Sequence, residues 1–232
     1  MAQQPEPRSR MFHIGGKPMR TWNCFVGCNF NCTYCSARKT ALTRLKNSPR
    51  YCDGFVPHRV EIDLNRSFRP GEFVFIAYMG DISFASADFI AEILERVAAQ
   101  PDVNFLVCSK NPMIYRLWPR PLPANLYLGT TIETNRNYQL SQAPDPHERY
   151  QSFLYFPHPH KFVSIEPICD FDMLRLMLWM ARLKPEIIEV GADNYHNHLP
   201  EPPWEKVETL LRGLKSICPN VIEKVGLHRL MK

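Results

Sequence analysis

The sequence has no run of about 18 apolar residues, and its first ten residues, MAQQPEPRSR, are polar. The absence of a long apolar run predicts that no helix spans a membrane. The polar first ten residues lack the apolar stretch of a secretory signal peptide. No internal repeat or low-complexity tract is present. We therefore expect a cytoplasmic protein with no membrane partner, in a compartment that keeps its thiols reduced.

Glycine is scarce, with 10 residues against 21 prolines, and the prolines divide the chain into short segments. The 232 residues, 45% of them hydrophobic, suffice for one full-sized domain. The net charge of +5 is compatible with an anionic substrate but does not require nucleic acid. We expect an N-terminal arm over residues 1–19 and a single domain over residues 20–232.

Short apolar runs recur along the chain, and helical patterns lie between several of them. The runs predict buried parallel strands over 73–79, 103–108, 125–130, 161–166 and 186–191. Further strands are expected over 19–25 and 221–225, and helices after Ser86, over 170–181 and over 202–214. This β-α alternation predicts a parallel sheet or barrel, with reactive residues just after the carboxyl ends of its strands.

Four of the eight cysteines lie between Cys24 and Cys35. Cys28, Cys32 and Cys35 form a CxxxCxxC loop directly after the first predicted strand. Three thiolates can bind three irons of a 4Fe-4S cluster and leave the fourth iron open to a ligand. Alternatively, Cys24 closes the cluster, or all four cysteines hold zinc in a non-enzymatic binding module. Because Cys24 precedes the tight loop on a strand-like segment, we favour the three-cysteine set.

This loop, with an aromatic residue before its last cysteine, resembles the radical S-adenosylmethionine (radical SAM) superfamily. The resemblance extends from about Thr21 to the C-terminal region through TWN, MGDISF, FLVCSKNP, NLYLGTTIETN, FVSIEPICDFD and IEVGAD. The succession looks like a radical SAM subfamily of unknown function found in phages and prokaryotes, in which a proline often replaces Cys24. The fold implied is α/β, a partial parallel (β/α)6 barrel.

The resemblance implies that Cys28, Cys32 and Cys35 ligate a 4Fe-4S cluster whose open iron binds S-adenosylmethionine (SAM). One electron then cleaves SAM to a 5′-deoxyadenosyl radical, which abstracts hydrogen from a substrate. Tyr34 matches the loop aromatic near the adenine, and Gly80-Asp81 stands where the superfamily carries a Gly-Gly-Glu-like segment. The expected SAM contacts are Tyr34, Gly80, Asp81, Ser109, Lys110, Thr131, Glu133, Asn135, Glu166 and Asp193.

Each of these residue types also has an ordinary structural role, such as a packed aromatic, a turn, a solvated lysine or a carboxylate paired with arginine. His196 and His198 form a His-x-His pair that can bind a metal or remain solvated. The basic run after the loop contacts an anionic substrate or covers a solvated helix face; its members are Arg38, Lys39, Arg44, Lys46 and Arg50. Cys108 is expected to be a small core residue.

The substrate is not identified by any motif. The basic charge and the phage association favour a nucleotide or nucleic acid, and the residue 136–160 insertion is expected to supply part of the pocket. The chemistry also needs a reducing electron donor of the flavodoxin or ferredoxin type. A second enzymatic alternative breaks another sulfonium bond of SAM and transfers its aminocarboxypropyl group.

Overall fold

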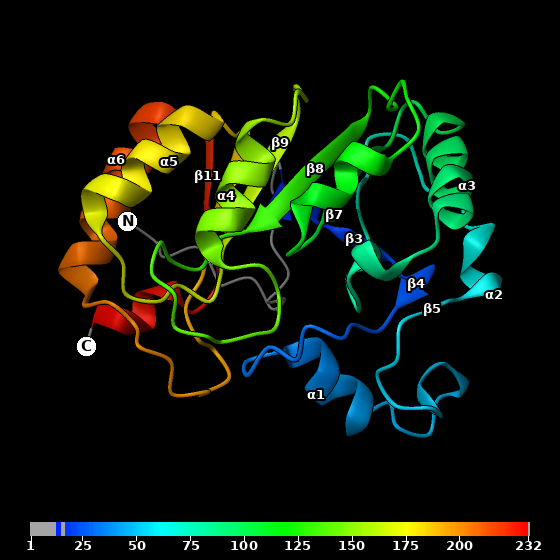
Figure 1. The fold of residues 1–232 in the computed structure, drawn as a ribbon, viewed down its shortest axis with the longest axis horizontal. Coiled ribbons are helices and arrows are strands. Elements are labelled where there is room, and N and C mark those ends of the chain that lie inside the picture. Colours follow the sequence, from blue (N-terminus) through cyan, green and yellow to red (C-terminus); the bar gives the residue numbers. More distant parts are fainter. Residues whose placement is uncertain (1–12, 15–16, 232) are drawn as a thin grey trace.

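The computed structural model describes residues 13–14 and 17–231, and it is built around one seven-stranded sheet that curls into a half-barrel (Figure 1). The strand order is β11-β10-β9-β8-β7-β6-β3, and every neighbouring pair is parallel. This confirms the predicted α/β partial parallel barrel. The strands are β3 (Arg20–Trp22), β6 (Phe73–Ile76), β7 (Asn104–Cys108), β8 (Leu126–Thr131), β9 (Lys161–Ile165), β10 (Ile187–Val190) and β11 (Asn220–Glu223).

The first predicted strand, over residues 19–25, is wrong in its extent. β3 ends at Trp22, and the chain then leaves the sheet to form β4 (Phe25–Val26), which pairs antiparallel with β5 (His58–Arg59). Strand β3 is interrupted at Asn23, the residue after Trp22. There the side-chain oxygen of Asn23 accepts the hydrogen bond from the N–H of Met79, at 3.0 Å, in place of a backbone carbonyl. The cysteine loop therefore starts from a separate two-stranded ribbon beside the sheet.

Most helices lie on the outer face of the sheet, as the predicted β-α alternation requires (Figure 1). Ser86 caps α3 as predicted, with its Oγ accepting a hydrogen bond from the N–H of Phe89 at 3.3 Å. The helices are α1 (Ser36–Leu42), α2 (Glu61–Leu64), α3 (Ala87–Ala98), α4 (Pro146–Leu154), α5 (Met173–Leu183) and α6 (Trp204–Ile217). Short 3-10 turns span Pro49–Tyr51, Ile82–Phe84, Pro112–Leu117 and Leu227–Met231.

Helix α4 was not predicted, although the sequence carries its signal inside the residue 136–160 insertion. Asp145 and Glu148 form a capping box, in which each side chain accepts a hydrogen bond from the other residue's backbone N–H at 2.8 Å. Pro146 occupies the first turn, where its missing N–H costs nothing. The helix turns a buried arginine, Arg149, toward the carboxyl end of β8.

The two faces of the sheet bury different hydrophobic clusters. Along β7, Phe105 and Val107 join the large outer core beneath the helices, whereas Leu106 joins an inner cluster with Phe162 and Ile187. This alternation is the two-residue period of a strand buried on both faces. Because apolar side chains fill the barrel interior, polar groups at the carboxyl ends of the strands are left to shape a site.

The predicted arm, residues 1–19, lies largely outside the described residues. His13–Ile14 (β1) pairs antiparallel with Lys17–Pro18 (β2), and Met19 is 5% exposed and packs with the inner cluster of the barrel. The boundary between arm and domain therefore stays a prediction. None of the helices in the described part of the chain is long and apolar enough to cross a membrane.

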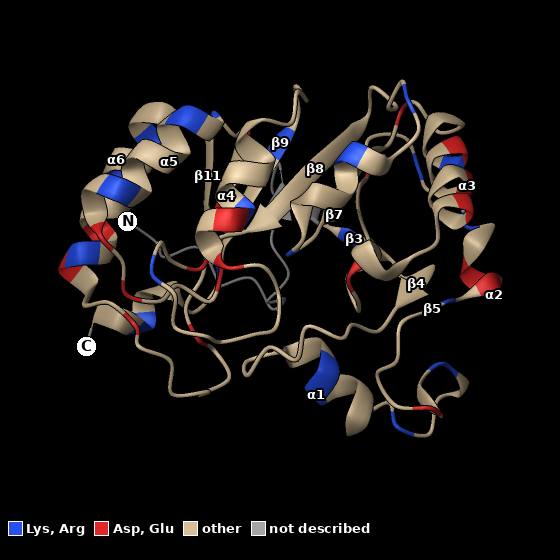
Figure 2. Cartoon of the chain, viewed as in Figure 1, with Lys and Arg blue, Asp and Glu red and all other residues tan. Residues whose placement is uncertain are grey.

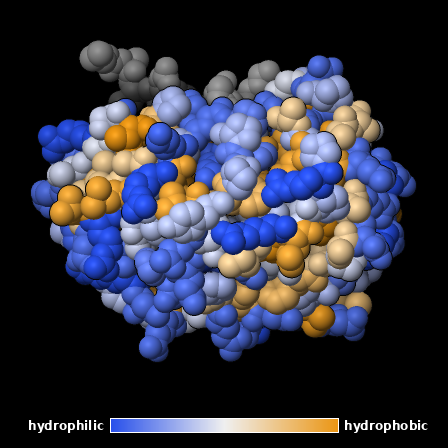
Figure 3. All heavy atoms as spheres, turned by 45° about the horizontal axis from the view of Figure 1, so that its top comes forward, coloured by the Kyte–Doolittle hydropathy of each residue, from blue (hydrophilic) through white to orange (hydrophobic). Residues whose placement is uncertain are grey.

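Charged residues of both signs are found along the helices and connecting loops (Figure 2). Large apolar side chains are exposed as well, including Leu174 and Leu178 on α5, at 75% and 52%. On the face shown in Figure 3, apolar and charged side chains are interspersed. Scattered apolar residues of this kind are normal for a protein surface.

Candidate active site

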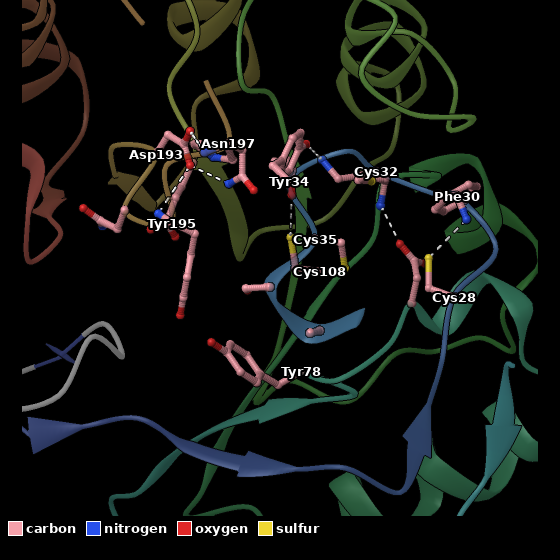
Figure 4. Close-up of a pocket in the computed structure, with 18 of the residues that line it drawn as sticks. Cys28, Phe30, Cys32, Tyr34, Cys35, Tyr78, Cys108, Asp193, Tyr195 and Asn197 are labelled. Atoms are coloured by element: carbon pink, nitrogen blue, oxygen red, sulfur yellow. Dashed lines mark hydrogen bonds between the residues drawn. The ribbon is translucent and has the colours of Figure 1, made fainter. Parts of the chain in front are cut away.

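The three cysteines of the CxxxCxxC motif lie on the loop between β4 and α1. The Sγ atom of Cys28 accepts a hydrogen bond from the N–H of Phe30 at 3.4 Å (Figure 4). The Sγ atom of Cys35 accepts one from the N–H of Arg38 at 3.3 Å. Such N–H···S bonds favour the thiolate form and tune the potential of iron–sulfur clusters. Burial raises the pKa of the Cys28 thiol to about 12.

Two glycines hold the cysteine loop against the end of β6. The N–H of Gly27 donates to the carbonyl of Met79 at 3.0 Å, and the N–H of Asp81 donates to the carbonyl of Gly27 at 3.1 Å. Gly27 has a φ of +84°, and a Cβ there would lie 2.2 Å from the Val56 oxygen. A Cβ on Gly80 would lie 2.8 Å from the Gly27 oxygen. Only glycine permits this approach, which places the loop directly beside Asp81.

A cavity of about 250 Å³ lies at the carboxyl ends of the strands and is lined by the three cysteines. Most of the predicted SAM contacts line the same cavity, namely Tyr34, Gly80, Asp81, Lys110, Thr131, Glu166 and Asp193. Ser109, Glu133 and Asn135 are absent from its lining. Parallel strand ends thus bring together residues that lie far apart in the sequence.

Asp81 is a fixed hydrogen-bond acceptor in the cavity wall. It is 5% exposed, and its Oδ1 accepts from Ser109 Oγ at 2.7 Å and from the Ser83 N–H at 3.0 Å. Its Oδ2 accepts from the N–H of Lys110 at 2.9 Å. A carboxylate has about four acceptor positions, so one remains for a ligand. Ser109 therefore orients Asp81 instead of lining the cavity.

Lys110 and Tyr34 are held together by a buried carboxylate, Glu133. The Nζ of Lys110 donates to the Tyr34 hydroxyl at 2.6 Å, and both groups bond to Glu133 Oε1. Burial, reinforced by the positive charge of Arg149, lowers the pKa of Lys110 to about 8. Two of the three ammonium hydrogens are engaged, so one is left for a ligand in the cavity.

Arg149 completes this network and is the residue that the sequence reasoning missed. Its Nη1 donates to Glu133 Oε2 at 2.8 Å and to the carbonyl of Thr131 at 2.6 Å. Glu133 and Arg149 side chains are only 3% and 4% exposed. Glu133, expected to contact SAM directly, is instead placed as a buried link between two cations. The capping box of α4 is the sequence signal that could have pointed to Arg149.

Asn135 also lies outside the cavity lining. Its Nδ2 donates to the carbonyl of Asp172 at 2.8 Å, and its Oδ1 accepts from the N–H of Asp172 at 2.9 Å. Its amide therefore fixes the start of α5. Thr131, Glu133 and Asn135 do not share one face, because β8 ends at Thr131 and the two-residue period of the strand does not continue beyond it.

Glu166 and Asp193 lie on the part of the wall formed after β9 and β10. Glu166 pairs with Lys224, which also lies 3.5 Å from Glu189 Oε2. Burial raises the pKa of Glu166 to about 6, despite the opposing charge of Lys224. Asp193 accepts hydrogen bonds from the backbone and side-chain nitrogens of Asn197, at 2.6 and 2.5 Å (Figure 4). Asp193 thus organises its own loop.

Cys24 and Cys108 lie outside the CxxxCxxC motif, and their surroundings differ. Cys24 is fully buried in the outer core, outside the cavity lining, and burial raises its pKa to about 12. Cys108 packs against the inner cluster, as expected of a small core residue, and it also lines the cavity, with its Sγ 3.8 Å from Thr131 Oγ1. It is the last residue of β7, where the pleat turns its side chain to the barrel interior.

His196 and His198 are exposed on the loop after β10, both with positive φ angles of 55° and 57°. Within residues 13–14 and 17–231, no three Cys, His, Asp or Glu side chains are close enough to share one metal ion. Thiolates that bind separate irons of a cluster do not have to meet at one point. The second-metal hypothesis for the histidines gains no support from this arrangement.

Several solved structures share the fold at low sequence identity. A tyrosine-to-phenylalanine mutant of spore photoproduct lyase is 11% identical with a TM-score of 0.59, covering 94% of this chain and 79% of that one. A cysteine-to-serine mutant of the same enzyme is 12% identical with a TM-score of 0.53, and the match covers 79% of this chain but only 59% of that one. A double mutant with bound AdoMet and dinucleoside spore photoproduct is 10% identical, with a TM-score of 0.53, covering 90% and 65%.

No curated protein matches the sequence. A family model described as "Protein of unknown function (DUF5131)" matches residues 18–198, which include the cysteine loop and all the strand ends from β3 to β10. Since the match covers well over half of the chain, the protein is a member of the DUF5131 family.

Proposed function

We propose that this protein is a radical SAM enzyme in which Cys28, Cys32 and Cys35 hold a 4Fe-4S cluster. The observation that carries the proposal is that these three thiols line one cavity with strand-end polar groups, while Cys24 is buried in the core. This arrangement supports a cluster with one iron open to a ligand. SAM would lie among the cysteine-side residues Tyr34, Gly80, Asp81, Lys110 and Thr131.

The residues present fit the two charged groups of SAM. The free acceptor position of Asp81 suits the ammonium, and the remaining N–H of Lys110 suits the carboxylate. Tyr34 offers an aromatic ring whose position is fixed through Glu133. When bound, the cluster supplies one electron to SAM, and the resulting 5′-deoxyadenosyl radical takes a hydrogen atom from the substrate.

For the substrate we propose a nucleotide or nucleic acid, and for the reductant a flavodoxin- or ferredoxin-like protein. Residues 36–59 carry six Lys and Arg side chains and one Asp, so this segment alone has a charge of +5, equal to that of the whole chain. It follows the cysteine loop and includes the basic residues of α1 marked in Figure 2, of which Lys39 is exposed. A fold shared with enzymes solved with dinucleoside spore photoproduct is consistent with this substrate class.

Two alternatives remain in view. A four-cysteine zinc or iron–sulfur module requires Cys24 to leave the core, where it is 0% exposed. Aminocarboxypropyl transfer uses the same cluster and cofactor. Product analysis distinguishes it, because it yields methylthioadenosine where the proposed reaction yields 5′-deoxyadenosine.

We also propose that the protein belongs to the phage and prokaryotic radical SAM subfamily that its motifs resemble.

The experiment for this function is EPR spectroscopy of the anaerobically reconstituted, dithionite-reduced protein. A reduced 4Fe-4S signal is expected to change on adding SAM, because the ligand occupies the open iron. Under the same conditions 5′-deoxyadenosine is expected to accumulate. A cluster signal that does not change on adding SAM would contradict the proposal and would indicate that a fourth protein ligand occupies the remaining iron.

For the substrate class, binding of a single-stranded oligonucleotide is expected to weaken steeply with salt. In residues 36–59, Arg50 is paired with Asp63 at 2.8 Å, whereas Lys39, Arg44 and Lys46 have no ion pair with any described residue. Replacing these three by glutamine is expected to reduce the slope of log K against log salt by about 2, at about 0.7 per phosphate contact.

The matched control replaces three exposed basic residues on other elements, Arg116, Lys184 and Arg212, by glutamine. It is expected to leave the salt slope nearly unchanged. Equal slopes for both triple variants, or no salt-sensitive binding by the unaltered protein, would remove the basic segment from substrate binding.

A further inference from the structure

The cavity has a second end that the proposed cofactor site does not use. The cysteine end is built by residues that follow β3, β6, β7 and β8. The second end is built by residues that follow β9, β10 and β11, at the other side of the sheet. Tyr78, from the turn after β6, lines the same cavity as Lys224, Glu166 and Tyr195.

Two tyrosine rings expose their surfaces in this part of the cavity. Tyr78 and Tyr195 line the cavity and are 39% and 45% exposed, although they are large aromatic side chains. Figure 4 shows both rings on the same side of the cavity, away from Cys28 and Cys32. Tyr78 packs edge-on against Phe75, with ring centroids 5.4 Å apart.

The loop that carries Tyr195 is held in place. Asp193 accepts a hydrogen bond from the Tyr195 N–H at 3.4 Å, and Arg229 donates to the carbonyl of Asp193 at 2.9 Å. Asn194 Nδ2 donates to the carbonyl of Val225 at 3.0 Å, which ties the loop to the segment after β11. A ring presented by a fixed loop can bind a flat ligand at little entropic cost.

A carboxylate faces the cavity between these rings and the strand ends. The Glu166 side chain is 25% exposed, whereas its partner Lys224 is 10% exposed and is shared with Glu189. Lys224 bonds to Glu166 Oε2, and no described residue donates to Oε1. A Cβ on Gly191 would lie 2.6 Å from that Oε1, so glycine leaves room for the carboxylate there. One lysine against two carboxylates leaves an excess of negative charge.

We propose that this second end binds the nucleobase of the substrate, with the ring against Tyr78 and Tyr195 and an amino group donating to Glu166 Oε1. Enzymes that act on bases read them by stacking on aromatic rings and by hydrogen bonds to the base edge. A carboxylate acceptor selects bases with an exocyclic amino group, such as cytosine, over uracil. The inference rests on the proposed function and moves Glu166, expected to contact SAM, to the substrate.

The test measures binding of cytidine and uridine to the reconstituted protein with saturating SAM, by saturation-transfer NMR titration. Cytidine is expected to bind more tightly than uridine, and Glu166→Gln is expected to remove that preference. Tyr195→Leu is expected to weaken both nucleosides by roughly tenfold to a hundredfold, the range for one base–aromatic stack. The matched control Tyr155→Leu changes a tyrosine that is 68% exposed outside the cavity, and it is expected to bind as the unaltered protein does.

The EPR response to SAM is recorded on the same samples, and it is expected to survive in Tyr195→Leu and Glu166→Gln. Loss of nucleoside binding and of the SAM response together would show that the second end holds the cofactor's own adenine, which overturns the inference. Absence of nucleoside binding to the SAM-loaded protein, or unchanged binding by Tyr195→Leu, overturns it as well. If instead the proposed function is wrong, the EPR signal of the unaltered protein itself does not change on adding SAM, and this result distinguishes the two failures.

Discussion

Replacing Cys32 by alanine is expected to abolish the reduced 4Fe-4S EPR signal and to remove most of the bound iron after reconstitution. A cubane bound by only two thiolates lacks one of its three protein ligands, so the cluster is expected to be lost. Loss of 5′-deoxyadenosine formation should follow. Iron and sulfide analysis, together with EPR of the dithionite-reduced variant, measures the effect.

The matched control is Cys24→Ala, the same chemical change four residues before the motif. Because Cys24 is fully buried in the outer core, this variant is expected to cost some stability but to keep iron content and the SAM-dependent EPR change. A Cys24→Ala protein that loses iron as completely as Cys32→Ala would point to a closed, four-cysteine site and against an open iron.

Glu133→Gln is expected to lower the free energy of unfolding by about 3–5 kcal/mol, the usual cost of breaking a buried ion pair by removing one partner. The carboxylate lies between Lys110 and Arg149, with side chains of all three groups at most 13% exposed, so its loss leaves two buried cations facing each other. Glutamine keeps one acceptor oxygen but no charge, so the contacts of Tyr34 and Lys110 with residue 133 weaken, and SAM affinity is expected to fall with stability. Urea denaturation of the protein without SAM measures the stability effect.

An exposed ion pair provides the control for this variant. Arg20 bonds to Glu72 at 3.0 Å with the arginine side chain 56% exposed, so Arg20→Ala is expected to cost within about 1 kcal/mol. If the Glu133→Gln protein were as stable as the Arg20→Ala protein, the ion pairs of Glu133 with Lys110 and Arg149 would contribute little to the free energy of unfolding. That result would argue against a stabilising role for Arg149.

The parts of the site that could be predicted are those with local patterns. The spacing of Cys28, Cys32 and Cys35 places three thiols on one loop, and an apolar run that ends in Met79-Gly80-Asp81 or Cys108-Ser109-Lys110 marks the carboxyl end of a strand. Parallel strands carry such ends to the same edge of the sheet, so the rule needs no knowledge of packing. That rule alone gathers most of the cavity's polar residues.

Residues just beyond a strand were harder to place, because the strand period stops where the strand stops. β8 ends at Thr131, so the side chains of Glu133 and Asn135 take directions that depend on what packs over them. Glu133 turns inward to Arg149, and Asn135 turns to the start of α5. That Cys108 borders the cavity could not be predicted, because the sequence of a strand buried on both faces does not show which residues point to the barrel interior.

The sequence by itself determined the β-α order, the three-cysteine loop and the strand ends that surround it, because each follows from short-range periodicity or spacing. The partial barrel was implied only by the resemblance to the radical SAM superfamily. Only the tertiary structure decided which charges meet. Arg149 reaches Glu133 across 16 residues, and Lys224 reaches Glu166 across 58. It also buried Cys24 while exposing its three neighbours to the cavity. Burial and long-range pairing depend on how helices and strand ends pack together, and this packing cannot be predicted from short sequence patterns.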